Sequence, residues 1–248
     1  MEKITINPNK EIKMIQDPYP VWIIDNILNQ ETPHSMISEW PKDDDERWFK
    51  GYAEIDGQKN ILEQGMRAIS SYEKMPPNVE RVMRYFHGEE FTKELERITG
   101  IDGLIPDETL QWSGLRMMLP GSWQLIHSDA RKNPKSGKRK ELTVLYYLNE
   151  NYDKTRDEGC LELWNDNMTE CVEQVEPLFN RMVIFKCTDT SYHGVPLVKG
   201  TRRFVTFSVV TDKDGSDRAK ALFVRRPEDE EEVTGLGISR SRIVPTQM

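Results

Sequence analysis

The sequence predicts a mainly β protein with N-terminal helices, built on an antiparallel sandwich or barrel. The double-stranded β-helix, or jelly roll, is one such fold. From about residue 110, apolar and polar residues alternate with a period of two in eight short segments. Turn-rich stretches rather than helical patterns separate these segments. Before residue 110, apolar residues recur at intervals of three and four, as in helices. The length of 248 residues suits one large domain.

The region 20–105 is predicted to be mainly helical. After Pro18 and Pro20, the apolar residues Ile23, Ile27 and Leu28 are spaced as on one face of a helix. A second helical segment is expected at about 77–98, where apolar residues again recur every three or four positions. We therefore expect residues 1–108 to form a helical support region of the same domain as the sheet.

The predicted catalytic core covers residues 109–211. Its candidate strands are Leu115–Leu119, Trp123–Ser128, Leu142–Leu148, Leu161–Trp164, Cys171–Val175, Met182–Phe185, Val195–Val198 and Arg202–Val210. Residues 212–248 lose the periodicity and contain an acidic run at 228–232. This C-terminal extension is expected to pack on the outside or to stay mobile.

Composition narrows the possible partners and location. The net charge of −8 argues against general nucleic-acid binding and against binding to anionic membranes. No apolar run is long enough to span a bilayer or to serve as a signal peptide. The three cysteines are odd in number and lack CxxC spacing, so neither a disulfide framework nor a zinc knuckle is indicated. The expected location is the cytoplasm, and the oligomeric state is not indicated.

His127 and Asp129 are the first candidate metal ligands. They lie two positions apart on a strand-like run, so both side chains leave the same face of the sheet. His193, at the start of a later strand, would complete a facial set of two imidazoles and one carboxylate. That set holds Fe(II) and leaves coordination positions open. An HxD pair is common by chance, however, and a hydrogen-bonded core histidine is the plain alternative for His127.

Between Leu115 and Thr211 the sequence resembles the Fe(II)/2-oxoglutarate oxygenases of the prolyl 4-hydroxylase type. The resemblance is closest to the branch that contains the hypoxia-inducible-factor prolyl hydroxylases and their bacterial and viral relatives. The matching pieces are His127-x-Asp129, LTVLYYLN at 142–149, GCLELW at 159–164, VEPLFNRMVIF at 175–185 and HGVPLVKGTR at 193–202. Their order and spacing agree over nearly one hundred residues. The helical region agrees only in outline, and the C-terminal extension is not covered.

The resemblance implies a jelly-roll core, Fe(II), 2-oxoglutarate as co-substrate, O₂, and ascorbate as a possible reductant. His127, Asp129 and His193 would be the iron ligands. Arg202, nine positions after His193, would bind the C5 carboxylate of 2-oxoglutarate, and a guanidinium fork suits a carboxylate. Tyr147, and more weakly Thr206, would contact the same carboxylate. Arg203 should face the other side of the strand, as a surface arginine with a buried stem.

Two features depart from the family or stand outside its pattern. The family often carries a tyrosine on the strand before HxD that contacts the co-substrate, but here the segment at 116–119 reads Arg-Met-Met-Leu. That contact is therefore either missing or supplied elsewhere. Lys and Arg occupy six of the ten positions from Arg131 to Lys140. We interpret this loop as solvated surface, with steering of an acidic substrate as the alternative.

The resemblance implies oxidative decarboxylation of 2-oxoglutarate to succinate and CO₂, coupled to hydroxylation of an unactivated C–H bond. Peptidyl proline is the first expectation for the substrate. A free amino acid, another small molecule or a natural product is the alternative. A cupin-like module that binds metal or ligand without turnover is a third reading, which the triad together with Arg202 disfavours.

Overall fold

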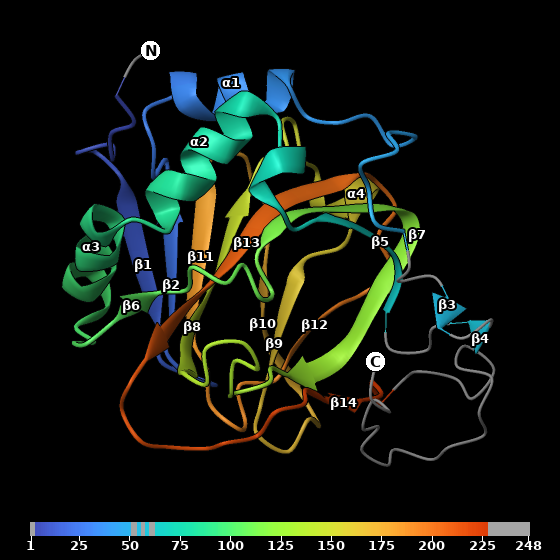
Figure 1. Cartoon of the computed structure of the whole chain (residues 1–248). Coiled ribbons are helices and arrows are strands. Elements are labelled where there is room, and N and C mark those ends of the chain that lie inside the picture. Colours follow the sequence, from blue (N-terminus) through green and yellow to red (C-terminus); the bar gives the residue numbers. More distant parts are fainter. Residues whose placement is uncertain (1–2, 51–53, 56–57, 60–62, 228–248) are drawn as a thin grey trace.

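The computed structural model describes residues 3–50, 54–55, 58–59 and 63–227. Twelve of the fourteen strands in this part of the chain belong to one large antiparallel sheet (Figure 1). The strands are β1 (Glu11–Ile15), β2 (Val21–Asp25), β3 (Glu54–Ile55), β4 (Gln58–Lys59), β5 (Glu63–Ile69), β6 (Ile105–Pro106), β7 (Gly114–Ser128), β8 (Arg139–Tyr147), β9 (Leu161–Trp164), β10 (Cys171–Val175), β11 (Arg181–Lys186), β12 (His193–Val195), β13 (Arg202–Thr211) and β14 (Leu222–Val224). The helices are α1 (Glu31–Ser38), α2 (Pro77–Phe86), α3 (Glu89–Thr99), the short α4 (Lys154–Asp157) and the 3₁₀ turn η1 (Tyr72–Lys74).

The large sheet runs in the order β1-β2-β11-β8-β13-β7-β12-β9-β10, and every pairing in it is antiparallel. β5 and β14 add to β7, and β6 adds to β13. The two outer strands of this order approach each other, because Lys13 on β1 and Glu173 on β10 form an ion pair of 3.9 Å. The sheet is therefore curled, with an inner face and an outer face.

Strands in the middle of the sheet are buried on both faces. On β8, Val144 and Tyr146 pack outward into the larger apolar cluster, while Leu145 and Tyr147 pack into a second cluster inside the curl. The same alternation divides β2 and β11 between the two clusters. Strands covered on both faces have nearly continuous apolar sequences. This explains why the helical expectation for the segment around Ile23 is wrong: Val21–Asp25 is the strand β2.

The helices α1, α2 and α3 lie together on the outer face of the sheet (Figure 1). α2 buries Val79, Val82, Met83 and Phe86 against it, and the Phe86 ring stacks on Phe207 of β13. The helical prediction for 77–98 is confirmed, with a break between Phe86 and Glu89. The wider expectation that 20–105 is mainly helical is wrong, because β2 and β5 join the large sheet.

The predicted β core is confirmed, with changes at some boundaries. Leu161–Trp164 and Cys171–Val175 are strands with the predicted bounds. The two predicted strands between 115 and 128 are one long strand, β7, and the strand expected at Val195–Val198 is β12, which begins at His193. Within the described residues no helix is long and apolar enough to cross a membrane. All three cysteines are free. The division into support region, core and extension stays a prediction.

The C-terminal extension does not simply pack on the outside. Its residues 222–224 form β14, which pairs with the end of β7: Phe223 lies opposite His127 and Leu222 opposite Ser128. Figure 1 shows β14 beside the end of β7. No periodicity predicted this strand, because three residues are too few to show one. The acidic run at 228–232 lies outside the described residues.

Candidate active site

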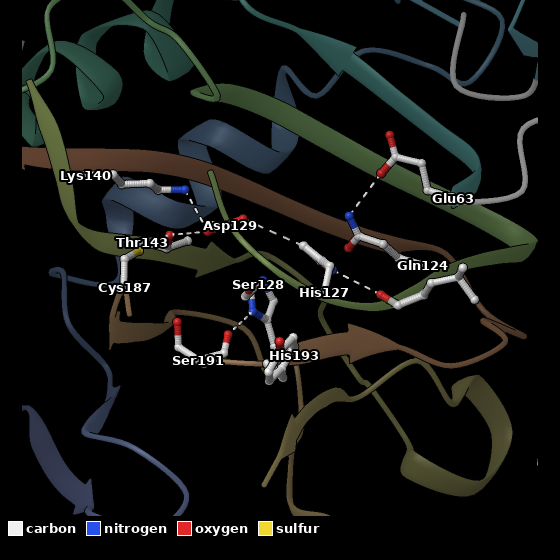
Figure 2. A network of polar contacts seen from close by, with 12 residues as sticks. Glu63, Gln124, His127, Ser128, Asp129, Lys140, Thr143, Cys187, Ser191 and His193 are labelled. Atoms are coloured by element: carbon white, nitrogen blue, oxygen red, sulfur yellow. Dashed lines mark hydrogen bonds and ion pairs between the residues drawn. The ribbon is translucent and has the colours of Figure 1, made fainter. Parts of the chain in front are cut away.

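The three predicted metal ligands come together at the end of β7. His127 and His193 are direct cross-strand partners on β7 and β12, and their ring centroids are 4.1 Å apart. Asp129 follows β7 directly, and its Oδ1 is 3.7 Å from His127 Nε2. One ligand atom from each of the three residues lies within 4.8 Å of the others. Register and strand alternation therefore assemble the cluster without help from long loops (Figure 2).

Both imidazoles are oriented by backbone carbonyls. His127 Nδ1 lies 3.0 Å from the carbonyl oxygen of Leu125, and His193 Nδ1 lies 3.1 Å from that of Ser191. A protonated Nδ1 donates to each carbonyl, which leaves the Nε2 lone pair free for a metal. Burial, reinforced by the neighbouring His193, lowers the pKa of His127 to about 3. Burial also lowers the pKa of His193. Both rings are therefore neutral near pH 7.

Asp129 is held by two side chains of β8. Lys140 Nζ and Thr143 Oγ1 each donate to Asp129 Oδ2 over 2.7 Å (Figure 2). Oδ1 is left facing the histidines. Burial alone would raise the pKa of Asp129, but Lys140 and the two histidines hold it well below its usual range. Because the histidines are themselves neutral, Lys140 is the main source of this effect. The carboxylate stays ionised and offers one oxygen toward the cluster.

The donor set fits Fe(II). Two neutral imidazoles and one ionised carboxylate are the ligands that non-haem iron takes in a facial arrangement with open positions. The hydrogen bonds to Nδ1 and to Oδ2 are the outer contacts that orient such ligands. The remaining histidines lie elsewhere: His34 pairs with Glu150, and His87 contacts Tyr72.

Arg202 and Tyr147 meet on the inner face of the sheet. Arg202 is only 3% exposed, and its Nη2 donates to the Tyr147 hydroxyl over 2.8 Å. Its Nη1 lies 3.7 Å from Met118 Sδ, and its Nε has no hydrogen-bond partner in the part of the chain that the structure describes. The guanidinium also lies against the rings of Tyr147 and Phe204. A buried cation therefore faces the interior of the curl with no carboxylate of the described chain beside it.

This arrangement fits the carboxylate of 2-oxoglutarate. Burial raises the pKa of Tyr147, and Arg202 partly offsets the rise, so the phenol keeps its proton. Because the Tyr147 oxygen accepts from Arg202, its own O–H is free to donate to a bound anion. Thr206 lies on the same face of β13 as Arg202, but is partly exposed. Met118, from the segment where the family has its tyrosine, contacts Arg202 instead.

Arg203 faces the other side of β13, as predicted. With Trp40, Met117 and Glu150 it lines a cavity of about 370 Å³. Burial lowers the pKa of Arg203, and it is half-buried. The cavity lies behind the strands that carry Arg202 and Met118, on the opposite face from the metal cluster. Cys160 is buried, and its Sγ lies 3.3 Å from the Tyr152 hydroxyl.

The basic loop is largely neutralised by neighbouring carboxylates. Four of its six cations form ion pairs, namely Lys132–Asp217, Lys138–Asp212, Arg139–Glu141 and Lys140–Asp129. The loop is therefore less positive than its sequence suggests, which disfavours steering of an acidic substrate. Arg131 and Lys140 are buried, so the interpretation as solvated surface applies only to the rest of the loop. Its role stays a prediction.

Sequence reasoning missed the contacts that Lys140, Thr143, Arg218 and Phe223 make around the cluster. Lys140 looked like one more solvated lysine of a basic run. Thr143 could have been found, because it shares its strand face with Tyr147. Arg218 donates to the carbonyl oxygen of Asp129 over 2.8 Å, and the Phe223 ring stacks on His127 at 4.9 Å. Nothing in the local sequence of these two residues signals such contacts.

Several solved structures with the same fold are prolyl hydroxylases. The prolyl hydroxylase from Trichoplax adhaerens, solved with a peptide fragment of the hypoxia-inducible-factor oxygen degradation domain, aligns with a TM-score of 0.57 at 18% identity, over 77% of this chain and 84% of that one. A Pseudomonas putida prolyl-4-hydroxylase aligns with a TM-score of 0.56 at 16% identity, over 78% of this chain and 93% of that one. The viral collagen prolyl hydroxylase of Paramecium Bursaria Chlorella virus-1 aligns with a TM-score of 0.52 at 14% identity, over 79% of this chain and 99% of that one. These likenesses confirm the jelly-roll fold.

No curated protein matches the sequence. Residues 113–209, however, match the model of the 2OG-Fe(II) oxygenase superfamily. The match spans β7 to β13 and so contains the three clustered ligands, Tyr147 and Arg202. Residues 113–209 therefore form a domain of the 2OG-Fe(II) oxygenase superfamily, and the protein is an Fe(II)-dependent dioxygenase that uses 2-oxoglutarate and O₂.

Proposed function

We propose that this enzyme hydroxylates a prolyl residue in a peptide, with His127, Asp129 and His193 as the iron ligands and Arg202 as the anchor of 2-oxoglutarate. The observation that carries the site assignment is the buried Arg202 guanidinium, which faces the same interior as the cluster and lacks a carboxylate within the described chain. The substrate proposal is supported by the fold, since three of the similar structures are prolyl hydroxylases.

Each protein group has a defined task in this proposal. Bound iron supplies the redox chemistry that couples decarboxylation of 2-oxoglutarate to hydroxylation of a C–H bond. The carbonyls of Leu125 and Ser191 keep both imidazoles turned toward the metal. Lys140 and Thr143 occupy Asp129 Oδ2, so that only Oδ1 is available as a ligand.

The co-substrate contacts follow from the same face of the sheet. Arg202 donates to the C5 carboxylate of 2-oxoglutarate, and the Tyr147 hydroxyl donates to it as well. Thr206 is a weaker candidate for the same contact. The apolar lining around Arg202, which includes Met118 and Phe204, excludes water and strengthens this charge-assisted contact.

The test measures succinate release with Fe(II), 2-oxoglutarate and ascorbate against proline-containing peptides, free amino acids and other metabolites. We expect peptide-dependent succinate together with a hydroxyproline product. His127→Ala, Asp129→Ala and His193→Ala should each abolish turnover while the thermal unfolding midpoint stays close to that of the parent. Succinate coupled only to a free amino acid would replace the peptide by a small-molecule substrate. Wild-type turnover in any of the three variants at limiting iron would contradict the metal assignment.

A further inference from the structure

The segment after the family match forms part of the wall around the metal cluster. The family match ends at residue 209, but β14 adds to the free edge of β7 with Phe223 opposite His127. The two rings are nearly parallel, with centroids 4.9 Å apart and an interplanar angle of 17°. β14 therefore extends the face of the sheet that carries the metal ligands.

The residues after Phe223 alternate between the two faces. Val224 packs with Ile126 and Trp164 on the side away from the metal. Arg226 lies on that side too, because its Nε donates to Glu162 Oε2 over 2.8 Å and its Nη2 donates to the carbonyl oxygen of Gln124. Side chains of an extended chain alternate. Arg225 is therefore directed to the Phe223 side, toward the face that holds His127.

Arg225 carries a buried guanidinium that the residues described by the structure do not fully hydrogen-bond. It is 2% exposed, and its Nε and Nη2 have no hydrogen-bond partner within the described ranges. No ion pair joins Arg225 to a carboxylate among those residues either, whereas the adjacent Arg226 is paired with Glu162. Leaving a guanidinium buried and unpaired is strongly unfavourable. Arg202 is another buried arginine with an unpaired Nε, and the proposed function assigns the co-substrate as its anion.

We propose that Arg225 binds a carboxylate of the substrate, so that this enzyme prefers a substrate with an acidic group close to the carbon that is hydroxylated. This inference rests on the proposed function and narrows its substrate class. The carboxylate can belong to an aspartate or glutamate side chain near the proline, or to a free C-terminus beside it. Both offer the planar pair of oxygens that a guanidinium fork binds.

The test compares peptides that differ only in this group. One series consists of blocked peptides with a central proline, in which aspartate or glutamate at each flanking position is compared with its asparagine or glutamine twin. A second pair carries the proline at the C-terminus as the free acid or as the amide. Dissociation constants are measured with Mn(II) in place of Fe(II), and kcat/KM with Fe(II). We expect at least one acid to exceed its amide twin by about tenfold or more in both measurements.

Variants then assign the preference to Arg225. Arg225→Gln should bring the acid-to-amide ratio close to one, and Arg225→Lys should retain part of it. Arg203→Gln, on the opposite face of β13, is the matched control and should keep the parent ratio. Thermal unfolding of each variant shows whether it is folded. If Arg225→Gln does not fold, the comparison of acid and amide peptides on the unsubstituted protein still tests the preference.

Three results overturn the inference: equal binding of all twins by the parent, an unchanged ratio in Arg225→Gln, or a gain for acidic and neutral peptides alike when the acidic run at 228–232 is changed to glutamine and asparagine. The last result would make the chain itself the source of the anion. A parent that binds acidic peptides preferentially but never releases succinate contradicts the proposed function and leaves the role of Arg225 standing. The binding and turnover measurements therefore separate the two failures.

Discussion

Replacing Arg202 by methionine should weaken the binding of 2-oxoglutarate far more than the binding of metal. Methionine keeps most of the volume of the side chain beside Met118 and Phe204, so the main loss is the charged fork. Arg202 is 3% exposed and already oriented by the Tyr147 hydroxyl. It therefore needs little reorganisation to bind a carboxylate, and water does not screen that contact.

The magnitude follows from this burial. Truncating one partner of a buried, hydrogen-bonded charge pair costs about 2–5 kcal/mol. At about 1.4 kcal/mol for each factor of ten, the dissociation constant of 2-oxoglutarate should rise by roughly 30-fold to several thousandfold. Tyr147→Phe removes one hydrogen bond to a charged group and should cost about 1.5–3 kcal/mol. Its effect should therefore be smaller than that of the arginine.

The assay is an anaerobic calorimetric titration of the Mn(II) protein with 2-oxoglutarate, with Mn(II) affinity measured separately. Arg203→Met is the matched control, because Arg203 is the next residue of the same strand and faces the cavity on the opposite side. It should change the dissociation constant less than threefold. A small effect of Arg202→Met, or a large effect of Arg203→Met, would refute the assignment of the co-substrate anchor.

Two further predictions concern charge away from the cluster. Glu63 is buried against Gln124, and its pKa is raised by burial from 4.5 to about 7. The folded protein therefore holds this proton where the unfolded chain has lost it, so the free energy of unfolding should fall by ~3 kcal/mol as pH rises from about 4.5 to about 7. In Glu63→Gln the free energy of unfolding should no longer fall over this pH range, and urea unfolding at both pH values measures it. If the substitution raised the free energy of unfolding equally at both pH values, the prediction would be contradicted. In the basic loop, neutralising Lys135, Lys138 and Arg139 together should leave the salt dependence of kcat/KM close to that of the parent, because two of the three are ion-paired. A flatter salt dependence would instead favour steering of an acidic substrate.

The parts of the site that could be predicted depend on local spacing. His127 and Asp129 are two residues apart, and strand alternation alone places them on one face. The same reasoning separates Arg202 from Arg203. The pairing of His193 with His127 is not local, and only the resemblance to the family indicates it.

The parts that could not be predicted depend on contacts that local sequence does not record. A strand buried on both faces, such as Val21–Asp25, has no alternation, so its apolar residues also fit a helical pattern. Lys140 stands in a run of cations, and only the fold shows that its side chain is buried on Asp129. The pairing of β14 with β7 joins residues about one hundred positions apart, over too few residues to leave a pattern.

The two halves of the site are fixed relative to each other by one strand. Thr143 and Tyr147 lie on the same face of β8, the first bonded to Asp129 and the second to Arg202. Four residues of extended chain span roughly 13 Å, which sets the separation between the metal end and the carboxylate end of the interior. The opposite face of β8 carries Val144 and Tyr146 into the apolar layer beneath the helices. Because the same backbone is held by that layer, the core sets the distance between the proposed iron site and the proposed co-substrate anchor.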